Sequence, residues 1–129
     1  MKVNPELIDE IKKYGAFDIS ACFNCGNCTA VCPLSKEDAS FPRKLIRAGH
    51  VGMEEKINSA IEPWHCYYCG ECSATCPREA QPGEYMMTLR RYLIAKYDIT
   101  GLSKIFYKNG WLQTWLALGM LAVFYWLYA

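Results

Sequence analysis

The chain has 129 residues, a formal net charge of +1 and eight cysteines. This length fits one small domain with an appendage. The nearly balanced charge excludes nucleic-acid binding driven by phosphate neutralisation. Residues 1–6 contain no apolar core of a secretory signal. We therefore expect the cysteines to bind metal in a reducing compartment rather than to form disulfides.

The first predicted element is a helix between Asn4 and Gly15. Asn4 can cap its first turn, Pro5 suits the first helical position, and Gly15 ends the helix. We expect its apolar face to pack on the rest of the domain. Four residues form this face at helical spacing: Leu7, Ile8, Ile11 and Tyr14.

The next feature is a motif that occurs twice. CFNCGNCTAVCP covers residues 22–33 and CYYCGECSATCP covers residues 66–77, so the two copies are 44 residues apart. The four cysteines, one glycine, one alanine and the final proline are identical in both copies. Self-similarity of this kind predicts a duplicated site with pseudo-two-fold symmetry, although two copies are too few for a solenoid.

The spacing C-x2-C-x2-C-x3-C-P is typical of cubane [4Fe–4S] ligation. Three closely spaced thiolates can surround one corner of the cube, and the cysteine before proline ligates the other cluster in two-cluster proteins. We therefore predict two [4Fe–4S] clusters with all eight cysteines as metal ligands. The first is held by Cys22, Cys25, Cys28 and Cys76, and the second by Cys66, Cys69, Cys72 and Cys32.

Other residues of the motifs have predicted supporting roles. Gly26 and Gly70 allow the positive φ that turns backbone amides toward sulfur. Pro33 and Pro77 end each loop after its last ligand. Candidates for the apolar shell around the clusters are Phe23, Leu34, Trp64, Tyr67 and Tyr68.

Other cofactor chemistry is disfavoured. Structural zinc sites use pairs of C-x2-C knuckles, which this run does not form. The eight cysteines already complete two clusters, so His50 and His65 are expected to be structural or surface residues. Met86 and Met87 are expected to pack within a helix rather than to bind metal. No G-x-G-x-x-G or P-loop motif is present, so no nucleotide or flavin site is predicted.

The segments around the second motif are predicted to be helical. One short helix covers residues 43–48 and ends at Gly49, and another covers residues 53–61 and ends before Pro63. A longer helix is expected over residues 84–98. No alternating strand pattern is found, so an all-α fold is predicted. One side of the longer helix carries Tyr85, Leu89, Tyr92, Leu93 and Tyr97.

The last predicted element is an apolar helix over residues 111–128, in which only Gln113 and Thr114 are clearly polar. At a rise of about 1.5 Å per residue it is about 27 Å long, close to the thickness of a bilayer's hydrocarbon core. Aromatic residues lie toward its ends, as at membrane interfaces. We predict a membrane helix. The alternative is a partner-buried helix in a larger complex.

The predicted domains are residues 1–101, a helical dicluster domain, and residues 102–129, a linker with the membrane helix. By the positive-inside rule, basic residues before the apolar segment place the cluster domain on the cytoplasmic side of the inner membrane. The segment contains no histidine, so it does not bind a b-type haem through histidine alone. The basic residues are Arg90, Arg91, Lys96, Lys104 and Lys108.

These features resemble a known family. The paired motifs, with FPRKLIRAG (residues 41–49) and CPREAQPGEYMMTLRRYL (residues 76–93), resemble the C subunit of heterodisulfide reductase. Within this family, the features are most similar to those of the C-type subunit of quinone-interacting membrane-bound oxidoreductase complexes. Iron–sulfur subunits of succinate dehydrogenase and glycerol-3-phosphate dehydrogenase contain a similar two-cluster helical domain. The resemblance covers about residues 15–100.

The resemblance implies an alpha-helical ferredoxin-like fold and a place in a multi-subunit complex. It implies a soluble flavoprotein or iron–sulfur catalytic partner, and a membrane quinone or haem partner. Soluble members lack the apolar segment, and membrane-fused members generally continue into several spans with haem-binding histidines. The chain differs from both groups in this respect.

We expect an electron-transfer iron–sulfur subunit that relays electrons between a soluble catalytic partner and a membrane quinone or haem partner. No proton-handling or nucleophilic constellation is recognised, so no catalytic residue is predicted. One alternative is a membrane-anchored iron–sulfur redox sensor or scaffold. Another is a quinone-reducing enzyme, for which the apolar segment offers only Gln113 and Thr114 as polar residues.

Overall fold

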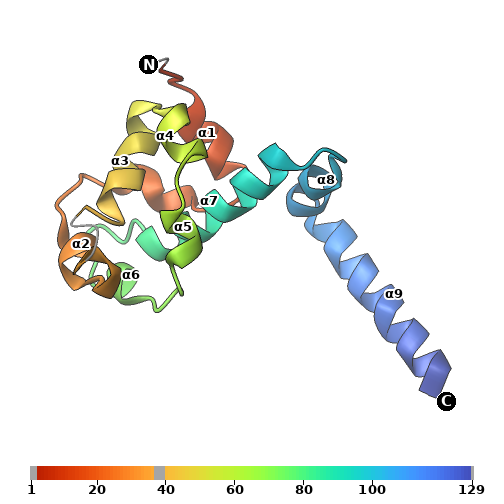
Figure 1. Ribbon diagram of the computed structural model, residues 1–129. Coiled ribbons are helices and arrows are strands. Elements are labelled where there is room, and N and C mark those ends of the chain that lie inside the picture. Colours follow the sequence, from red (N-terminus) through yellow and green to blue (C-terminus); the bar gives the residue numbers. More distant parts are fainter. Residues whose placement is uncertain (1–2, 37–39, 129) are drawn as a thin grey trace. The chain divides into compact units, whose positions relative to one another are not determined.

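The computed structural model describes residues 3–36 and 40–128, and within these ranges every regular element is helical (Figure 1). The prediction of an all-α fold is confirmed. Contacts divide the chain into two compact units, Met1–Leu93 and Ile94–Ala129. The outer ends of the predicted domains, Met1 and Ala129, lie outside the described residues.

The first unit contains most of the helices. In chain order they are α1 (Leu7–Lys12), the 3₁₀ helix η1 (Phe17–Ala21), α2 (Asn27–Val31), η2 (Pro33–Lys36), α3 (Arg43–Val51), α4 (Glu54–Asn58), α5 (Glu62–His65), α6 (Glu71–Ala74) and most of α7 (Pro82–Tyr97). The second unit contains α8 (Leu102–Lys108) and α9 (Gly110–Tyr128).

Helix α1 forms in the predicted region but begins later than expected, at Leu7. Its N-cap residue is Glu6, with no side-chain cap, so the predicted cap at Asn4 and the predicted first helical position at Pro5 are wrong. The side-chain oxygen of Asn4 instead accepts a hydrogen bond of 3.1 Å from the Glu6 amide, in the turn before the helix. Gly15, with φ of 132°, follows the end of the helix. The predicted apolar face is confirmed, with Leu7 and Ile11 fully buried and Ile8 and Tyr14 partly buried against the core.

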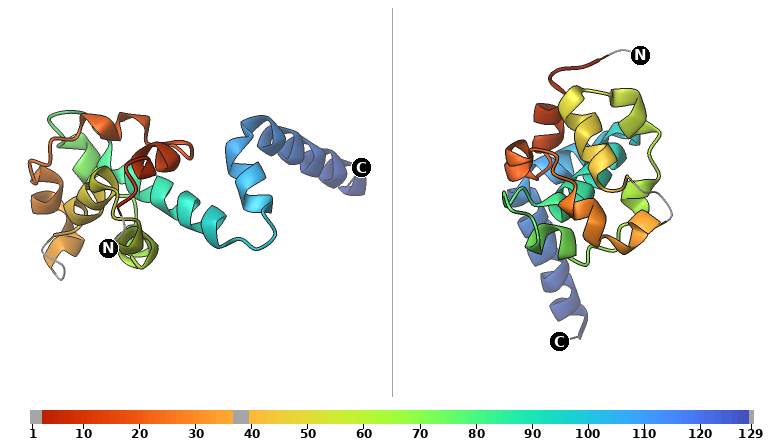
Figure 2. Two further views of the ribbon diagram at one scale, coloured as in Figure 1. Left: turned by 90° about the horizontal axis from the view of Figure 1, so that it is seen from above. Right: turned by 90° about the vertical axis from the view of Figure 1, so that its left-hand side faces the viewer.

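Helix α7 runs among the shorter helices of the first unit (Figures 1 and 2). It contributes many of the buried side chains in the core of this unit. Its predicted apolar face is confirmed except at Tyr97, which is 62% exposed because it lies beyond Leu93, where the contacts of the first unit end. Met86 is buried and Met87 partly buried, as expected for packing residues. The buried members of the predicted face are Tyr85, Leu89, Tyr92 and Leu93.

The predicted end of the helix at Gly49 is wrong. Helix α3 continues to Val51, and Gly52, with φ of 79°, takes the left-handed conformation that ends it. Gly49 instead lies inside the helix, where an added Cβ would overlap the hydroxyl of Tyr85. The glycine is therefore explained by close packing between α3 and α7 rather than by helix termination.

The prediction around Pro63 also needs correction. Helix α4 ends at Asn58, earlier than expected, and Pro63 lies in the first turn of the short helix α5. Proline is tolerated there because amides in a first turn have no partner within the helix.

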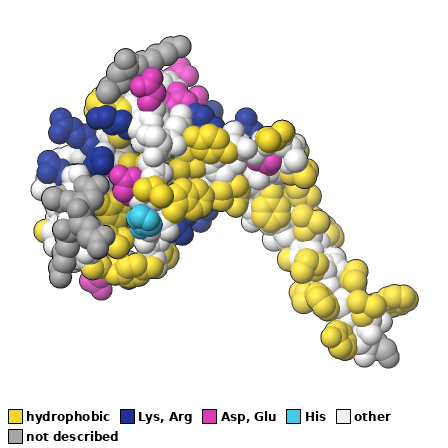
Figure 3. Space-filling view, in the orientation of Figure 1, with side chains coloured by type: hydrophobic (Ala, Val, Ile, Leu, Met, Phe, Trp, Pro, Cys, Tyr) yellow, Lys and Arg dark blue, Asp and Glu magenta, His cyan; other side chains and the backbone are white. Residues whose placement is uncertain are grey.

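Helix α9 matches the predicted apolar segment to within one residue. Its large apolar side chains are exposed along its length, as Figure 3 shows by their yellow colour. Among the described residues, α9 is the one helix that is both long enough and apolar enough to cross a membrane. None of its apolar stretch is buried within the chain. This pattern suggests membrane association.

Candidate metal-binding site

The two cysteine motifs fold into loops of the same form. Gly26 and Gly70, with φ of 91° and 86°, precede helices α2 and α6 in the left-handed conformation. The predicted positive φ of both glycines is therefore confirmed. Asn24 and Tyr68 occupy equivalent places with φ of 61° and 57°. The Asn24 amide donates a hydrogen bond of 3.4 Å to Cys22 Sγ, as expected for an amide turned toward a sulfur ligand.

One cavity lies beside the first motif. It contains about 290 Å³ of empty space, part of it open to solvent. Besides the cysteines, its lining includes Asn24, Asn27 and Arg43. Four cysteines line it: Cys22, Cys25, Cys28 and Cys76.

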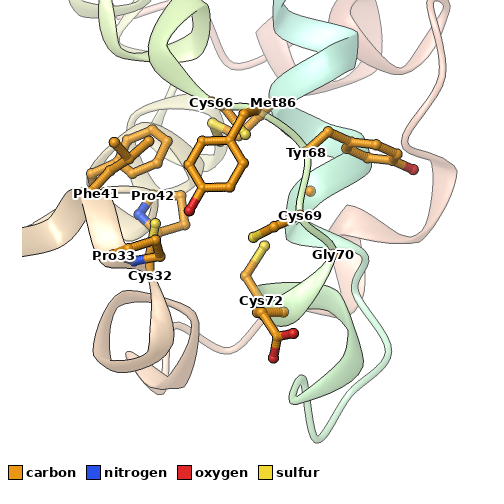
Figure 4. Close-up of a pocket in the computed structure, with 14 residues that line it drawn as sticks. Cys32, Pro33, Phe41, Pro42, Cys66, Tyr68, Cys69, Gly70, Cys72 and Met86 are labelled. Atoms are coloured by element: carbon orange, nitrogen blue, oxygen red, sulfur yellow. The ribbon is translucent and has the colours of Figure 1, made fainter.

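A second cavity lies beside the second motif, with about 390 Å³ of empty space. Figure 4 shows Cys32 across the cavity from Cys69 and Cys72. The rest of the lining is largely apolar and aromatic and includes Phe41 and Met86. The four cysteines that line it are Cys32, Cys66, Cys69 and Cys72.

Each cavity thus joins three cysteines of one motif with the last cysteine of the other. Within residues 3–36 and 40–128, no three Cys, His, Asp or Glu side chains are spaced to hold a single metal ion. The thiols instead surround a space, which is the arrangement that four-thiolate ligation of an iron–sulfur cube needs. The donor set and its placement therefore fit a [4Fe–4S] cluster in each cavity.

The pKa of two of these thiols is raised by their surroundings. Burial raises the pKa of the Cys28 thiol, and the nearby Cys22 adds to the effect. Burial, with a contribution from Cys66, also raises the pKa of Cys72 to about 11. Both groups are neutral at pH 7 in the chain alone, so ligation of iron must displace their protons.

Helices α2 and α6 bring the motifs together. They lie side by side in the first unit (Figures 1 and 2). The side-chain amide of Asn27 in α2 donates a hydrogen bond to the carbonyl of Thr75, just after α6. Within α6, the Ser73 hydroxyl accepts a hydrogen bond of 3.1 Å from the Gly83 amide at the start of α7. These contacts connect the two cysteine loops to each other and to α7.

Arg90 of α7 has a role that the sequence did not reveal. Its Nε donates to the Pro63 carbonyl at 2.7 Å, and its Nη2 donates to the carbonyls of Trp64, at 3.1 Å, and Cys66. Its guanidinium also lies 6.0 Å from the centre of the Trp64 ring. Arg90 thus holds the backbone that leads into the second motif. Sequence patterns indicate only a basic residue before the apolar segment.

The predicted apolar shell is only partly present. Tyr67, Tyr68 and Leu34 line the second cavity. Phe23 and Trp64 are 61% and 47% exposed and are not among the described lining residues of either cavity. An aromatic residue after the first cysteine therefore does not guarantee contact with the cluster site.

The two histidines lie where the sequence suggested. His50 is half-buried in α3, and its Nδ1 lies 2.9 Å from the Ile46 carbonyl. His65 is exposed at the end of α5. Neither lines either of the two cysteine cavities described above.

Comparison with known proteins agrees with this geometry. Residues 18–80 match a family model described as a 4Fe–4S dicluster domain. A protein of Archaeoglobus profundus, named as similar to the C subunit of heterodisulfide reductase, is 34% identical over 103 residues, covering 79% of this chain and 55% of the relative. The second iron–sulfur C subunit of the CoB–CoM heterodisulfide reductase of Methanocaldococcus jannaschii is 30% identical over 103 residues, covering 74% of this chain and 55% of the relative.

A third relative matches a shorter region. The C subunit of the H(2):CoB–CoM heterodisulfide, ferredoxin reductase of Methanothermobacter thermautotrophicus is 33% identical over 62 residues, covering 48% of this chain and 34% of the relative. The matched region therefore spans about half, or less, of the length of these curated relatives.

Proposed function

Because the chain belongs to the 4Fe–4S dicluster family that includes the C subunits of heterodisulfide reductases and proteins like them, we propose that it relays electrons within a multi-subunit oxidoreductase. It binds two [4Fe–4S] clusters. Electrons enter from a soluble flavin- or iron–sulfur-containing catalytic partner and leave toward a membrane quinone or haem partner, or flow in the opposite direction. The names of the relatives, as subunits of reductase complexes, support the multi-subunit setting.

The observation that carries this proposal is the exchange of one cysteine between the two motifs. Each cavity is lined by the complete ligand set that the crossed pattern requires. We therefore assign Cys76 to the cluster of the first motif and Cys32 to that of the second. When bound, each cluster accepts or releases one electron at a time.

The residues of the chain hold these two sites next to each other. Helix α2 carries the third ligand of one motif, α6 carries that of the other, and the two helices are in contact. Cys25 and Cys69 are exposed, one in each loop. An exposed ligand in each loop would let a different partner approach each site, which suits a relay better than a closed store of electrons.

We also propose that α9 crosses the inner membrane with the cluster unit on the cytoplasmic side. Its 19 residues correspond to about 28 Å, enough for the hydrocarbon core with little tilt. The side of the membrane follows from the basic residues that precede it. A reducing cytoplasm also suits eight cysteines that must stay available to iron.

A quinone-reducing role of this chain has less support. A quinone pocket on α9 needs free polar groups. Gln113 already donates to the Phe106 carbonyl at 2.8 Å, and Thr114 to the Trp111 carbonyl at 2.8 Å. Both polar side chains of the apolar segment are therefore bonded within the chain.

The test is the iron and acid-labile sulfide content of anaerobically purified chain, with EPR spectra after dithionite reduction. About eight irons and eight sulfides per chain, with spin-coupled signals, are expected of two neighbouring cubanes. Stoichiometric zinc, or iron for a single cluster, would contradict the relay. Clusters that neither accept electrons from a reduced flavoprotein nor pass them to a quinone or haem protein would favour the sensor or scaffold.

A further inference from the structure

Helix α8 of the second unit has two chemically different faces. Leu102, Ile105 and Phe106 recur at helical spacing on one side and are 66%, 52% and 41% exposed. Lys104 and Lys108, one turn apart, are exposed on another side. This short helix is amphipathic, and its apolar side chains are still largely accessible in the folded second unit.

The apolar face of α8 borders a cavity shared with the first turns of α9, with about 750 Å³ of empty space, part of it open to solvent. Leu112 and Leu116 line it from α9, and Leu102, Ile105 and Phe106 line it from α8. The space between the two helices is thus an apolar wedge.

Hydrogen bonds fix the geometry of this wedge. Gln113 of α9 donates its side-chain amide to the Phe106 carbonyl at 2.8 Å. At the start of α8, the Asp98 carboxylate accepts hydrogen bonds from the amides of Thr100 at 2.8 Å and Ser103 at 2.7 Å. Both ends of α8 are therefore bonded, and Asn109 alone separates α8 from α9.

A helix that crosses a bilayer begins at the membrane surface, and one residue is too short to carry the preceding helix far from it. We propose that α8 lies on the membrane surface, with Leu102, Ile105 and Phe106 among the acyl chains and its two lysines at anionic headgroups. Lipid chains then fill the wedge between α8 and α9. This inference rests on the proposed membrane span of α9.

Lipid fits this surface for two reasons. The wedge is continuous with the apolar surface of α9, which the same acyl chains would cover. A lysine pair beside an apolar stripe is also the pattern that binds anionic interfaces, because the lysine stems can extend along the apolar region while the ammonium groups reach the headgroups.

The test is photo-crosslinking in the full chain with its clusters bound. p-Benzoylphenylalanine is placed at one position at a time, and the protein is reconstituted in vesicles of phosphatidylcholine and phosphatidylglycerol. The test positions are Ile105 and Phe106. The matched positions on the polar side of the same helix are Lys104 and Lys108, and Val123 reports on α9. The iron–sulfur absorbance of each variant verifies folding, and mass spectrometry identifies the adducts.

We expect lipid adducts from the probe at Ile105, Phe106 and Val123, and no lipid adducts from the probe at Lys104 or Lys108. We also expect phosphatidylglycerol to be enriched among the Ile105 adducts over its share in the vesicles, and Lys104→Gln with Lys108→Gln to remove that enrichment. Equal adducts on both sides of α8, or crosslinks from Ile105 to a second copy of the chain, would overturn the proposal while α9 stays in the bilayer. Loss of lipid adducts at Val123 would instead overturn the membrane span itself.

Discussion

At the scale of single residues, Gly49 of α3 packs closely against Tyr85 of α7. The Tyr85 hydroxyl is buried and lacks a hydrogen-bond partner among the described residues. Burial also raises the pKa of this phenol well above its ordinary value. The hydroxyl thus occupies space that a methyl group at position 49 would fill, and it does so without the bond that usually offsets burial of a polar group.

This contact predicts a compensating pair of substitutions. Gly49→Ala should destabilise the protein by about 1–3 kcal/mol through overpacking. Tyr85→Phe should be close to neutral because the hydroxyl that it removes has no partner. In the double variant the nearest ring atom, Cζ, lies 3.2 Å from the new Cβ, so most of the lost stability should return. Thermal unfolding followed by circular dichroism measures all four proteins, and a double variant as unstable as Gly49→Ala would refute the packing argument.

A second difference between single residues distinguishes the two cluster sites. Where the first loop has Asn24 and Asn27, the second has Tyr68 and Glu71 at the equivalent positions. Arg43 lines the first cavity, whereas Glu71 lines the second. A nearby cation stabilises a reduced cluster and an anion destabilises it, so the reduction potential should be higher at the first site.

Arg43→Gln should therefore lower the higher of the two midpoint potentials. Arg47→Gln is the matched control, because it removes the same charge from the exposed side of α3 at a residue that is not among those lining the cavity. The shift should be modest, since the Arg43 side chain is exposed and solvent screens its charge. An EPR-monitored redox titration measures both potentials. Equal shifts in the two variants, or a shift of the lower potential, would show that Arg43 does not act locally on the first site.

At the scale of elements, the contact between α2 and α6 makes the crossed ligand sets possible. Each helix carries the third cysteine of its motif and leads to the fourth, which reaches the opposite cavity. A cluster in one cavity would thus depend on both motifs.

Serine variants of the cysteines test this exchange. Cys76→Ser should leave the same residual EPR signal as Cys22→Ser, because both remove ligands of the first cluster. It should differ from Cys66→Ser, although Cys66 belongs to the same motif as Cys76. Cys32→Ser should in turn match Cys66→Ser. If each variant instead resembles the others of its own motif, the ligands are not crossed.

The pairing of α5 with α7 through Arg90 supports a further prediction. Arg90→Gln should remove charge-assisted hydrogen bonds to carbonyls before the second motif, at a cost of about 1.5–3 kcal/mol. We expect selective loss of the second cluster, leaving the residual signal seen in Cys66→Ser. Arg91→Gln is the control on the same helix, because Arg91 bonds to the Tyr14 carbonyl and Glu84 instead. Equal cluster loss in both variants would mean that Arg90 stabilises the whole cluster unit rather than the second cluster site.

The extent to which these elements could be predicted follows from the range of the interactions behind them. The spacing of the cysteines can be read directly from the sequence. The two sets of four cysteines that it predicts are the sets that line the two cavities. Long apolar periodicity revealed α7 and α9. Helices of four to seven residues, such as α2, α6 and α8, are too short for such a pattern. Gly49 and Arg90 act through distant partners, so sequence alone suggested a helix end and a surface charge.

At the scale of the whole molecule, the side of the membrane decides which partners can reach the clusters. Basic residues from Arg90 to Lys108 lie between the second motif and α9, and such residues are retained on the cytoplasmic side. Trypsin added to spheroplasts should therefore leave the cluster unit intact, whereas trypsin added to inverted vesicles should degrade it.

An epitope tag after Ala129 should show the opposite accessibility if α9 spans the bilayer, and immunoblotting follows both ends. Digestion of the cluster unit in intact spheroplasts would reverse the orientation and require a donor outside the cytoplasm. A tag protected in spheroplasts together with an intact cluster unit would mean that α9 is covered by another protein or lies on the inner surface.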